Sequence, residues 1–290
     1  MTPSCLFGAA TFDWEWNPSF LALRAALERR FESEVTALVG AVPEVAPADL
    51  PAYLMELGRP PRGRSLSQYV KREAGLQQFT ELLVHRSVYS LMEADHHSLA
   101  IPRIRGGGKP ALVEIQADEY GGGIPGRLHS QLFALTMREL GLDPRYGTYV
   151  ESVTAPSLAN VNLISLFGMH ARHRGALLGN LAITEIGSHH VNRNLKLGLD
   201  RLGGSDLAQV FFQEHVVADA VHEQLAAHDM CGRFAQAHPE ETASVVLGAL
   251  ASAAVGTAAN EALLQAWEQG CSSLREPVPA GTALPEPELV

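Results

Sequence analysis

The segment FFQEHVVADAVHEQ, residues 211–224, carries His215, Asp219 and His222 among apolar side chains. Residues four and seven positions apart on a helix point in nearly the same direction, so these three side chains would share one stripe. Two imidazoles and a carboxylate that face an apolar core are costly unless a partner satisfies them. The stripe therefore predicts a metal site, a hydrogen-bonded contact between helices, or a polar face that meets water.

Further acidic and histidine side chains lie in apolar, helix-like surroundings elsewhere in the chain. With two residues of the stripe they make a set of three Glu, two His and one Asp. The members of this set are Glu93, Glu119, His129, Glu185, His215 and Asp219. Carboxylates can bridge two iron ions, and imidazoles are ligands that iron accepts. Helical proteins build dinuclear sites from such side chains on facing helices, so the set suits two irons.

The spacing between Glu119 and His129 requires a break in the chain, because residues ten apart do not share a face of one helix. Gly121, Gly122 and Gly123 lie between them and allow the chain to turn. Two short helices could then each direct a ligand to one point. A ferritin-like site would need Glu-x-x-His twice, but the sequence has it once, so that bundle is disfavoured.

The order of these residues resembles that of the haem-oxygenase-like diiron oxidases, also called iron-containing redox enzymes. The order is Glu93, Glu119, a His ten residues later, a further Glu, and then His-x-x-x-Asp. The segments EADHHSLAIPR, VEIQADEYGGG…LHSQLF and EHVVADAVHE carry the resemblance. It runs from about Arg86 to His228, around half of the chain.

The resemblance implies that the six residues bind two iron ions, with Glu119 best suited to be shared by both. Manganese could replace one iron. It also implies O2-dependent oxidation of a small amine or amino-acid-derived substrate, with N-oxygenation favoured. Diiron desaturation and oxidative C–C cleavage of an amino or fatty acid are the alternatives. An electron donor is a possible partner, and residues 211–222 are expected to be mobile before metal binds.

Three further residues could orient a ligand or a proton without binding metal. His222 continues the stripe, Tyr120 follows Glu119, and His96 lies beside Glu93. Tyr120 could equally be a core tyrosine, and His96 could equally meet solvent at a helix end. Two other functions also stay open. A haem-binding oxygenase would leave three buried Glu unexplained, and a non-catalytic metal-binding or scaffold protein would take up iron without oxygen-dependent turnover.

The elements that must position these residues are predicted to be helices, because helical periodicity recurs and strand-like alternation is hard to find. A haem-oxygenase-like helical domain over residues 1–271 and a Pro-rich, mobile tail over 272–290 are expected. Helices are predicted over 18–40, a short segment ending near 58, 66–97, a segment running into 121–123, 127–141, 157–202 with a break near 187, 206–231 and 240–269.

Composition indicates which partners and which cellular compartment to expect for such a site. The 290 residues are 46% hydrophobic and carry a formal net charge of −10, which disfavours nucleic-acid binding. Three cysteines without a CxxC spacing disfavour a thiolate zinc site and suit a reducing cytoplasm. The uncharged segment 243–259 falls short of a membrane span and predicts a packed internal helix. We therefore expect a cytoplasmic enzyme with a small-molecule substrate and no membrane partner; a homodimer is possible.

Overall fold

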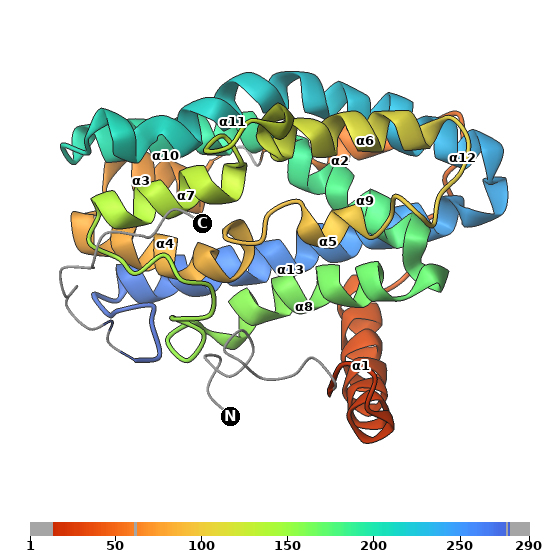
Figure 1. Ribbon diagram of the computed structural model, residues 1–290, viewed down its shortest axis with the longest axis horizontal. Helices are drawn as coiled ribbons and strands as arrows, with labels where there is room; N and C mark the ends of the chain where they lie inside the picture. Colours follow the sequence, from red (N-terminus) through yellow and green to blue (C-terminus); the bar gives the residue numbers. More distant parts are fainter. Residues whose placement is uncertain (1–13, 61–62, 277, 279–290) are drawn as a thin grey trace.

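The described residues of the computed structural model, 14–60, 63–276 and 278, form helices and no strand, which confirms the predicted all-α class (Figure 1). The α-helices are α1 (Pro18–Val39), α2 (Leu50–Leu57), α3 (Leu66–Arg72), α4 (Leu76–Ser90), α5 (Asp95–Ser98), α6 (Gly108–Glu119), α7 (His129–Glu139), α8 (Ala155–Met169), α9 (Arg174–Glu185), α10 (Ser188–Arg201), α11 (Asp206–Gln224), α12 (Arg233–Ala237) and α13 (Thr242–Glu268). Short 3-10 turns are η3 (Gly121–Gly123), η4 (Ala171–His173) and η6 (Pro239–Glu241), and η5 (Leu225–Gly232) is a π-helix.

Helix α13 runs along the length of the molecule and packs most extensively against α9 (Figure 1). Two glycines permit this close approach. A Cβ at Gly179 of α9 would collide with the carbonyl oxygen of Val245, and a Cβ at Gly248 of α13 would collide with that of Ala176. The packed internal helix predicted for residues 243–259 is therefore present, although the wider segment is also long and apolar enough to span a membrane by composition.

Two apolar clusters form the core of the described residues. The first cluster joins α9, α13, α8, α6 and η5, and includes Leu181. The second joins α4, α7, α10 and α11, and includes Phe211 and Phe133. Because Leu181 is one turn before Glu185 and Phe211 is one turn before His215, each cluster holds a helix that carries a candidate ligand.

The helix predicted over residues 66–97 is broken twice. Helix α3 ends at Arg72, and α4 begins after Gly75, whose backbone N–H is bonded by the side chain of Gln78 at 2.9 Å. Helix α4 then ends at Ser90, so that Glu93 lies on a turn before the short α5. No glycine or proline marks this second break, which explains why periodicity alone predicted a continuous helix.

The helices predicted after residue 150 are present, but the structure differs from the prediction at two places. The break near Gly187 is confirmed, because this residue has φ of 79° between α9 and α10. A further break at residues 170–173 was not predicted. Helix α11 continues into η5, so the predicted 206–231 helix changes to π geometry in its last two turns.

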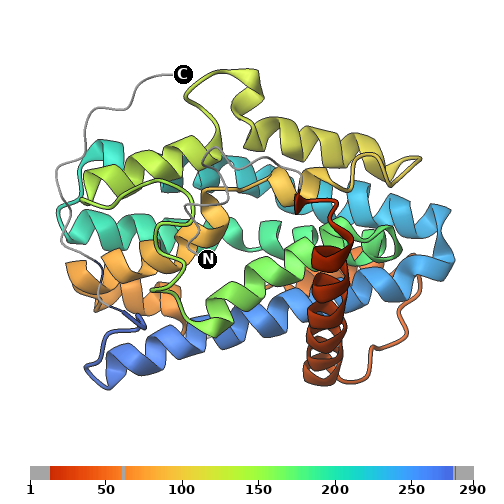
Figure 2. The same cartoon turned by 60° about the horizontal axis from the view of Figure 1, so that its bottom comes forward.

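Helix α1 projects from one face of the bundle (Figure 1) and comes forward over it in Figure 2. The predicted start is confirmed, since the side chain of Asn17 accepts a hydrogen bond from Ser19 N at 2.9 Å. Ion pairs attach the helix to the body: His170 Nε2 lies 2.7 Å from Glu28, and Arg172 makes two contacts of 2.6 and 2.7 Å with Glu32.

The first residues of the predicted tail are bonded to the body of the protein. Ser273 donates from its backbone N and from Oγ to Glu81 Oε2, each at 2.8 Å, and Arg275 N donates to Ser152 O at 2.8 Å. Residues 277 and 279–290 lie outside the described residues, so the mobility of the tail stays a prediction.

Candidate metal centre

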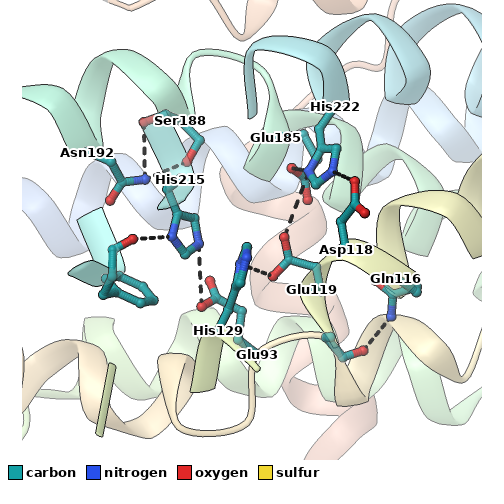
Figure 3. Close-up of polar contacts among 12 residues, drawn as sticks. Glu93, Gln116, Asp118, Glu119, His129, Glu185, Ser188, Asn192, His215 and His222 are labelled. Carbon is teal, nitrogen blue, oxygen red and sulfur yellow. Dashed lines mark hydrogen bonds and ion pairs between the residues drawn. The ribbon is translucent and has the colours of Figure 1, made fainter. Parts of the chain in front are cut away.

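The structure brings five of the six predicted ligands together from five places in the chain (Figure 3). Each comes from a helix end, a turn or the buried face of a helix. They are Glu93 after α4, Glu119 at the end of α6, His129 at the start of α7, Glu185 at the end of α9, and His215 on α11. The sixth, Asp219, is on α11, but its side chain lies outside the described residues.

Four of these residues form a first ligand group. Glu93, Glu119, His129 and His215 each offer one ligand atom, and the four atoms lie within 4.8 Å of one another. His129 Nδ1 is 2.8 Å from Glu119 Oε2, and His215 Nε2 is 3.7 Å from Glu93 Oε2. All four side chains are at least nine-tenths buried. Two carboxylates and two imidazoles around one point are a donor set that suits iron.

A second ligand group shares Glu119 with the first. Its members are Glu119, Glu185 and His222, whose ligand atoms also lie within 4.8 Å of one another. His222 Nδ1 is 3.2 Å from Glu185 Oε2 and 3.8 Å from Glu119 Oε1. Glu119 therefore directs one oxygen to each group, which supports its expected role as the shared carboxylate. His222 was expected only to orient other groups, but its Nδ1 lies among the candidate ligand atoms.

The glycine turn between Glu119 and His129 places their side chains next to each other. Gly121, Gly122 and Gly123 have φ between 63° and 75°, values that other residues rarely adopt. Gly121 is also the tightest of the three, because a Cβ there would lie 2.5 Å from the carbonyl carbon of Arg127. The chain reverses within this turn, so α6 ends and α7 begins close to the same point.

In His215 and His222, the ring nitrogen that faces away from the candidate ligand atoms has a hydrogen-bond partner, which fixes the orientation of the ring. His215 Nδ1 donates to the backbone carbonyl of Phe211 at 2.8 Å, and this bond turns Nε2 toward Glu93. His222 Nε2 donates to Asp118 Oδ2 at 3.0 Å and leaves Nδ1 toward Glu119 and Glu185. Metal-binding histidines commonly have such a carbonyl or carboxylate partner on the other nitrogen.

Several buried atoms of the site lack a hydrogen-bond partner, which is costly without a ligand. They include Glu93 Oε2, Glu119 Oε2 and His129 Nδ1. The last two atoms are only 2.8 Å apart, yet they are not aligned as donor and acceptor. Atoms that lie close without bonding to each other, and that converge on one point, fit a common metal ion. The residues present therefore fit iron.

The two carboxyls of the first group have pKa values shifted in opposite directions. Burial raises the pKa of Glu119, and the nearby Glu185 and Glu93 carboxylates add to this effect against His129. Burial acts on Glu93 in the same way, but the imidazoles of His215 and His129 outweigh it and lower its pKa. Such opposed shifts arise where like charges share a site and counter-charges are unevenly placed.

The second group stabilises positive charge. Burial by itself would lower the pKa of His222, but hydrogen bonds to Glu185 and Asp118 and the charge of Glu119 raise it to about 9. An imidazolium among three carboxylates shows that the surroundings favour a cation at this point. A metal ion has the same requirement.

A cavity of about 10 Å³, room for about one water molecule, adjoins the candidate ligands. Besides Glu93, Glu119, Glu185 and His215 it is lined by Tyr89, Ala94, His97, Gln116, Leu181, Thr184 and Ser188. Burial and the neighbouring carboxylates raise the pKa of Tyr89 well above its ordinary value, so its hydroxyl stays protonated. The cavity is thus a small, acidic and polar space beside the ligand atoms.

The remaining sequence-predicted residues take other positions. The Tyr120 hydroxyl donates to Asp95 Oδ1 at 2.8 Å and not to Glu119. His96 is outside both ligand groups, whereas its neighbour His97 lines the cavity and donates from Nε2 to Asn180 Oδ1 at 2.8 Å. His97 was not singled out from the sequence, because only the unpredicted break after α4 turns it toward the cavity.

Comparison with known proteins agrees with this geometry. The family model described as iron-containing redox enzyme matches residues 80–257, which is more than half of the chain and includes both ligand groups. No curated protein matches the chain. The all-helical architecture is that of the haem-oxygenase-like fold. The ordered Glu and His motifs, the fold and the matched family therefore agree, and the chain belongs to the family of iron-containing redox enzymes.

Proposed function

We propose that this protein is an O2-dependent non-haem diiron oxidoreductase that oxidises a small amine or amino-acid-derived substrate. N-oxygenation is the favoured reaction. The observation that carries the proposal is the position of Glu119, which contributes one oxygen to each of two buried ligand groups. Two ligand groups joined by one carboxylate call for two metal ions close together.

In this proposal, Glu93, His129 and His215 hold one metal, Glu185 and His222 hold the other, and Glu119 is shared. The side chain of Asp219 completes the set expected from the sequence. Two ferrous ions would supply the electrons that reduce O2, and manganese in one position remains compatible with the same donors. The protein's own contribution is to fix the donor positions and to keep the surroundings buried.

The donor set favours non-haem iron over haem. A haem iron already has four nitrogen ligands from its ring and needs one or two axial residues. Glu93, Glu119 and Glu185 would then be buried beside an apolar ring with no metal ion to bind, and the burial of three carboxyl groups is costly. Bare metal cations satisfy all three.

The lining of the cavity supports an amine as the substrate class. The residues that line it include three carboxylates and neither Lys nor Arg. With two divalent ions bound, these carboxylates are neutralised, so the lining supports an amine through its neutral acceptors, such as Gln116 Oε1, which has no hydrogen-bond partner. Insertion of one oxygen atom of O2 into an N–H bond consumes two electrons and two protons and releases water. Repeated turnover therefore requires an external electron donor.

We extend the proposal to the compartment, the partners and the oligomeric state of the enzyme. The net charge of −10 and the cysteine content favour a cytoplasmic protein without nucleic-acid or membrane partners. The exposed Trp16, Leu23 and Leu27 of the projecting α1 region are compatible with a homodimer.

The experiment that tests the reaction is a product analysis with the iron-loaded protein. Amines, amino acids and fatty acids are offered singly with O2 and a reductant, and products are identified by mass spectrometry. An amine product that has gained one oxygen atom from labelled O2 supports N-oxygenation. Loss of two hydrogens or a shortened carbon chain indicates the alternatives, and iron uptake without any product indicates a non-catalytic protein. Glu119→Ala, which disrupts both ligand groups, is the negative control.

A further inference from the structure

The backbone directly after Glu93 has an unusual conformation. Ala94 has φ of 76° and ψ of −37°, and it is the one non-glycine residue with positive φ among the described residues. This region is unfavourable for a residue with a Cβ, and such conformations persist only where surrounding contacts hold them. Ala94 is 3% exposed and lines the cavity, so the conformation occurs inside the site.

Gln116 of α6 holds this residue in place. Its Nε2 donates to the carbonyl oxygen of Ala94 at 2.7 Å (Figure 3). The same nitrogen donates to Ser98 Oγ at 2.8 Å. The backbone N of Ser98 donates to the same carbonyl oxygen at 2.9 Å. Gln116 is 2% exposed, so water does not compete for these bonds. One amide group thus binds both ends of the turn from Ala94 to Ser98.

A second contact from the same helix supports the turn. Ser98 Oγ lies 3.0 Å from the Tyr120 hydroxyl, which in turn donates to Asp95 Oδ1 at 2.8 Å. The hydrogen bonds can therefore run in one direction from Gln116 through Ser98 and Tyr120 to Asp95. Gln116 of α6 and Tyr120, which directly follows this helix, lie on either side of Glu119 in the sequence. The segment that carries one candidate ligand is bonded directly to the turn that carries another.

We propose that Gln116 is a positioning residue that holds Ala94 in its strained conformation and thereby fixes the Glu93 carboxylate opposite Glu119. Relaxation of Ala94 to a negative φ would redirect the chain at this turn and move the neighbouring Glu93 away from His215. The inference deepens the proposed function and rests on it, because it assigns a task to a residue beside the same ligands. It also gives a physical reason for the break after α4.

The test combines loss of the hydrogen bonds with relief of the strain. Gln116→Leu removes both donated bonds, and we expect iron to bind about 10- to 100-fold more weakly in an anaerobic titration with ferrous iron. Ala94→Gly should bind iron as the wild type does, since glycine adopts positive φ freely. In the double variant, Ala94→Gly should restore most of the lost affinity. A purely structural role for Gln116 would not be rescued by a change at Ala94.

Gln209 provides a matched control. It is a buried glutamine on α11 that donates to the carbonyl oxygen of Gly204 at 2.9 Å, away from the candidate ligands. Gln209→Leu should leave iron affinity unchanged. If Gln116→Leu does not fold, Gln116→Asn replaces it, because its amide is one methylene too short to reach Ala94.

The outcomes separate this inference from the proposed function. A wild-type protein that binds no iron overturns both. A wild-type protein that binds two irons, with equal binding by the Gln116 variant, overturns the inference alone. Weak binding that Ala94→Gly does not rescue also overturns it, because Gln116 would then act by another route than the backbone of Ala94.

Discussion

At the scale of single residues, Glu119 has the largest consequence, because it belongs to both ligand groups. Glu119→Ala should abolish binding of both irons. Glu185→Ala should leave the four-residue group of Glu93, Glu119, His129 and His215 intact and retain one iron. Iron is counted per chain after anaerobic loading and removal of free metal.

The control for this comparison is Glu114→Ala, which removes an exposed carboxylate from the same helix and should leave two irons bound. Retention of two irons by Glu119→Ala would show that the two groups are not joined through this residue. Loss of both irons from Glu185→Ala would show that the metals bind only as a pair.

Residue types and spacing were sufficient to predict which side chains gather. They did not predict which of these side chains offer a ligand atom and which only orient a ligand. Glu93, Glu185 and His215 stood out because they lie in apolar surroundings. His222 lay on the predicted stripe, yet its contact with Glu119 depends on how α11 packs against α6 and α9, which no local pattern reports. Asp118 could not be predicted as a partner of His222 for the same reason.

At the scale of elements, the turn between α6 and α7 is the most demanding connection. Gly121→Ala should destabilise the protein by more than the roughly 1–2 kcal/mol expected for positive φ alone, because its Cβ also meets Arg127. Gly123→Ala has a similar φ but open space, so it should cost only the conformational part. Urea unfolding of the two metal-free variants measures the difference. Equal losses of stability would mean that the contact with Arg127 relaxes at no cost.

A second prediction concerns the contact between α4 and the C-terminal segment. His85 bonds Ser157 through Nδ1 at 2.8 Å and Ser273 through Nε2 at 3.2 Å, and burial lowers its pKa from 6.5 to about 4. The unfolded chain therefore binds a proton that the folded protein does not bind between these pH values. The contribution of neutral, buried His85 to the free energy of unfolding is therefore full above pH 6.5. It is lost as the pH falls toward 4.

The measurement is the free energy of unfolding of metal-free wild type and His85→Gln near neutral pH and near pH 5. The stability difference between them should shrink by about 2 kcal/mol at the lower pH, because glutamine does not titrate. A difference that stays constant would mean that His85 keeps an ordinary pKa in the folded protein.

Helix existence could be predicted from periodicity, whereas helix breaks could be predicted only where glycine marked them. Gly187 and the three glycines after Glu119 indicated the turns at these positions. The break at Ala94 is held by Gln116, more than twenty positions later in the sequence. A tertiary hydrogen bond overrides local propensity there, so a single-sequence pattern predicts a continuous helix. The break is nevertheless what places Glu93 and His97 beside the cavity.

At the scale of the whole molecule, the environment of α13 distinguishes a core helix from a membrane helix. Its apolar segment passes the length and composition test for a span, and 39% of that window is buried. Its packing against α9, α8 and α2 favours a core helix. We expect the protein expressed without detergent to remain in the supernatant after ultracentrifugation. Retention in a membrane pellet after salt and alkaline washes would contradict the core assignment.

The central claim is that one buried site of this protein holds two iron ions joined by Glu119. The most direct measurement is an anaerobic titration of the metal-free protein with ferrous iron, followed by Mössbauer spectroscopy after exposure to O2. The account predicts two irons per chain and a magnetically coupled ferric pair that Glu119→Ala lacks. One iron per chain, or two uncoupled irons that survive the loss of Glu119, would contradict it.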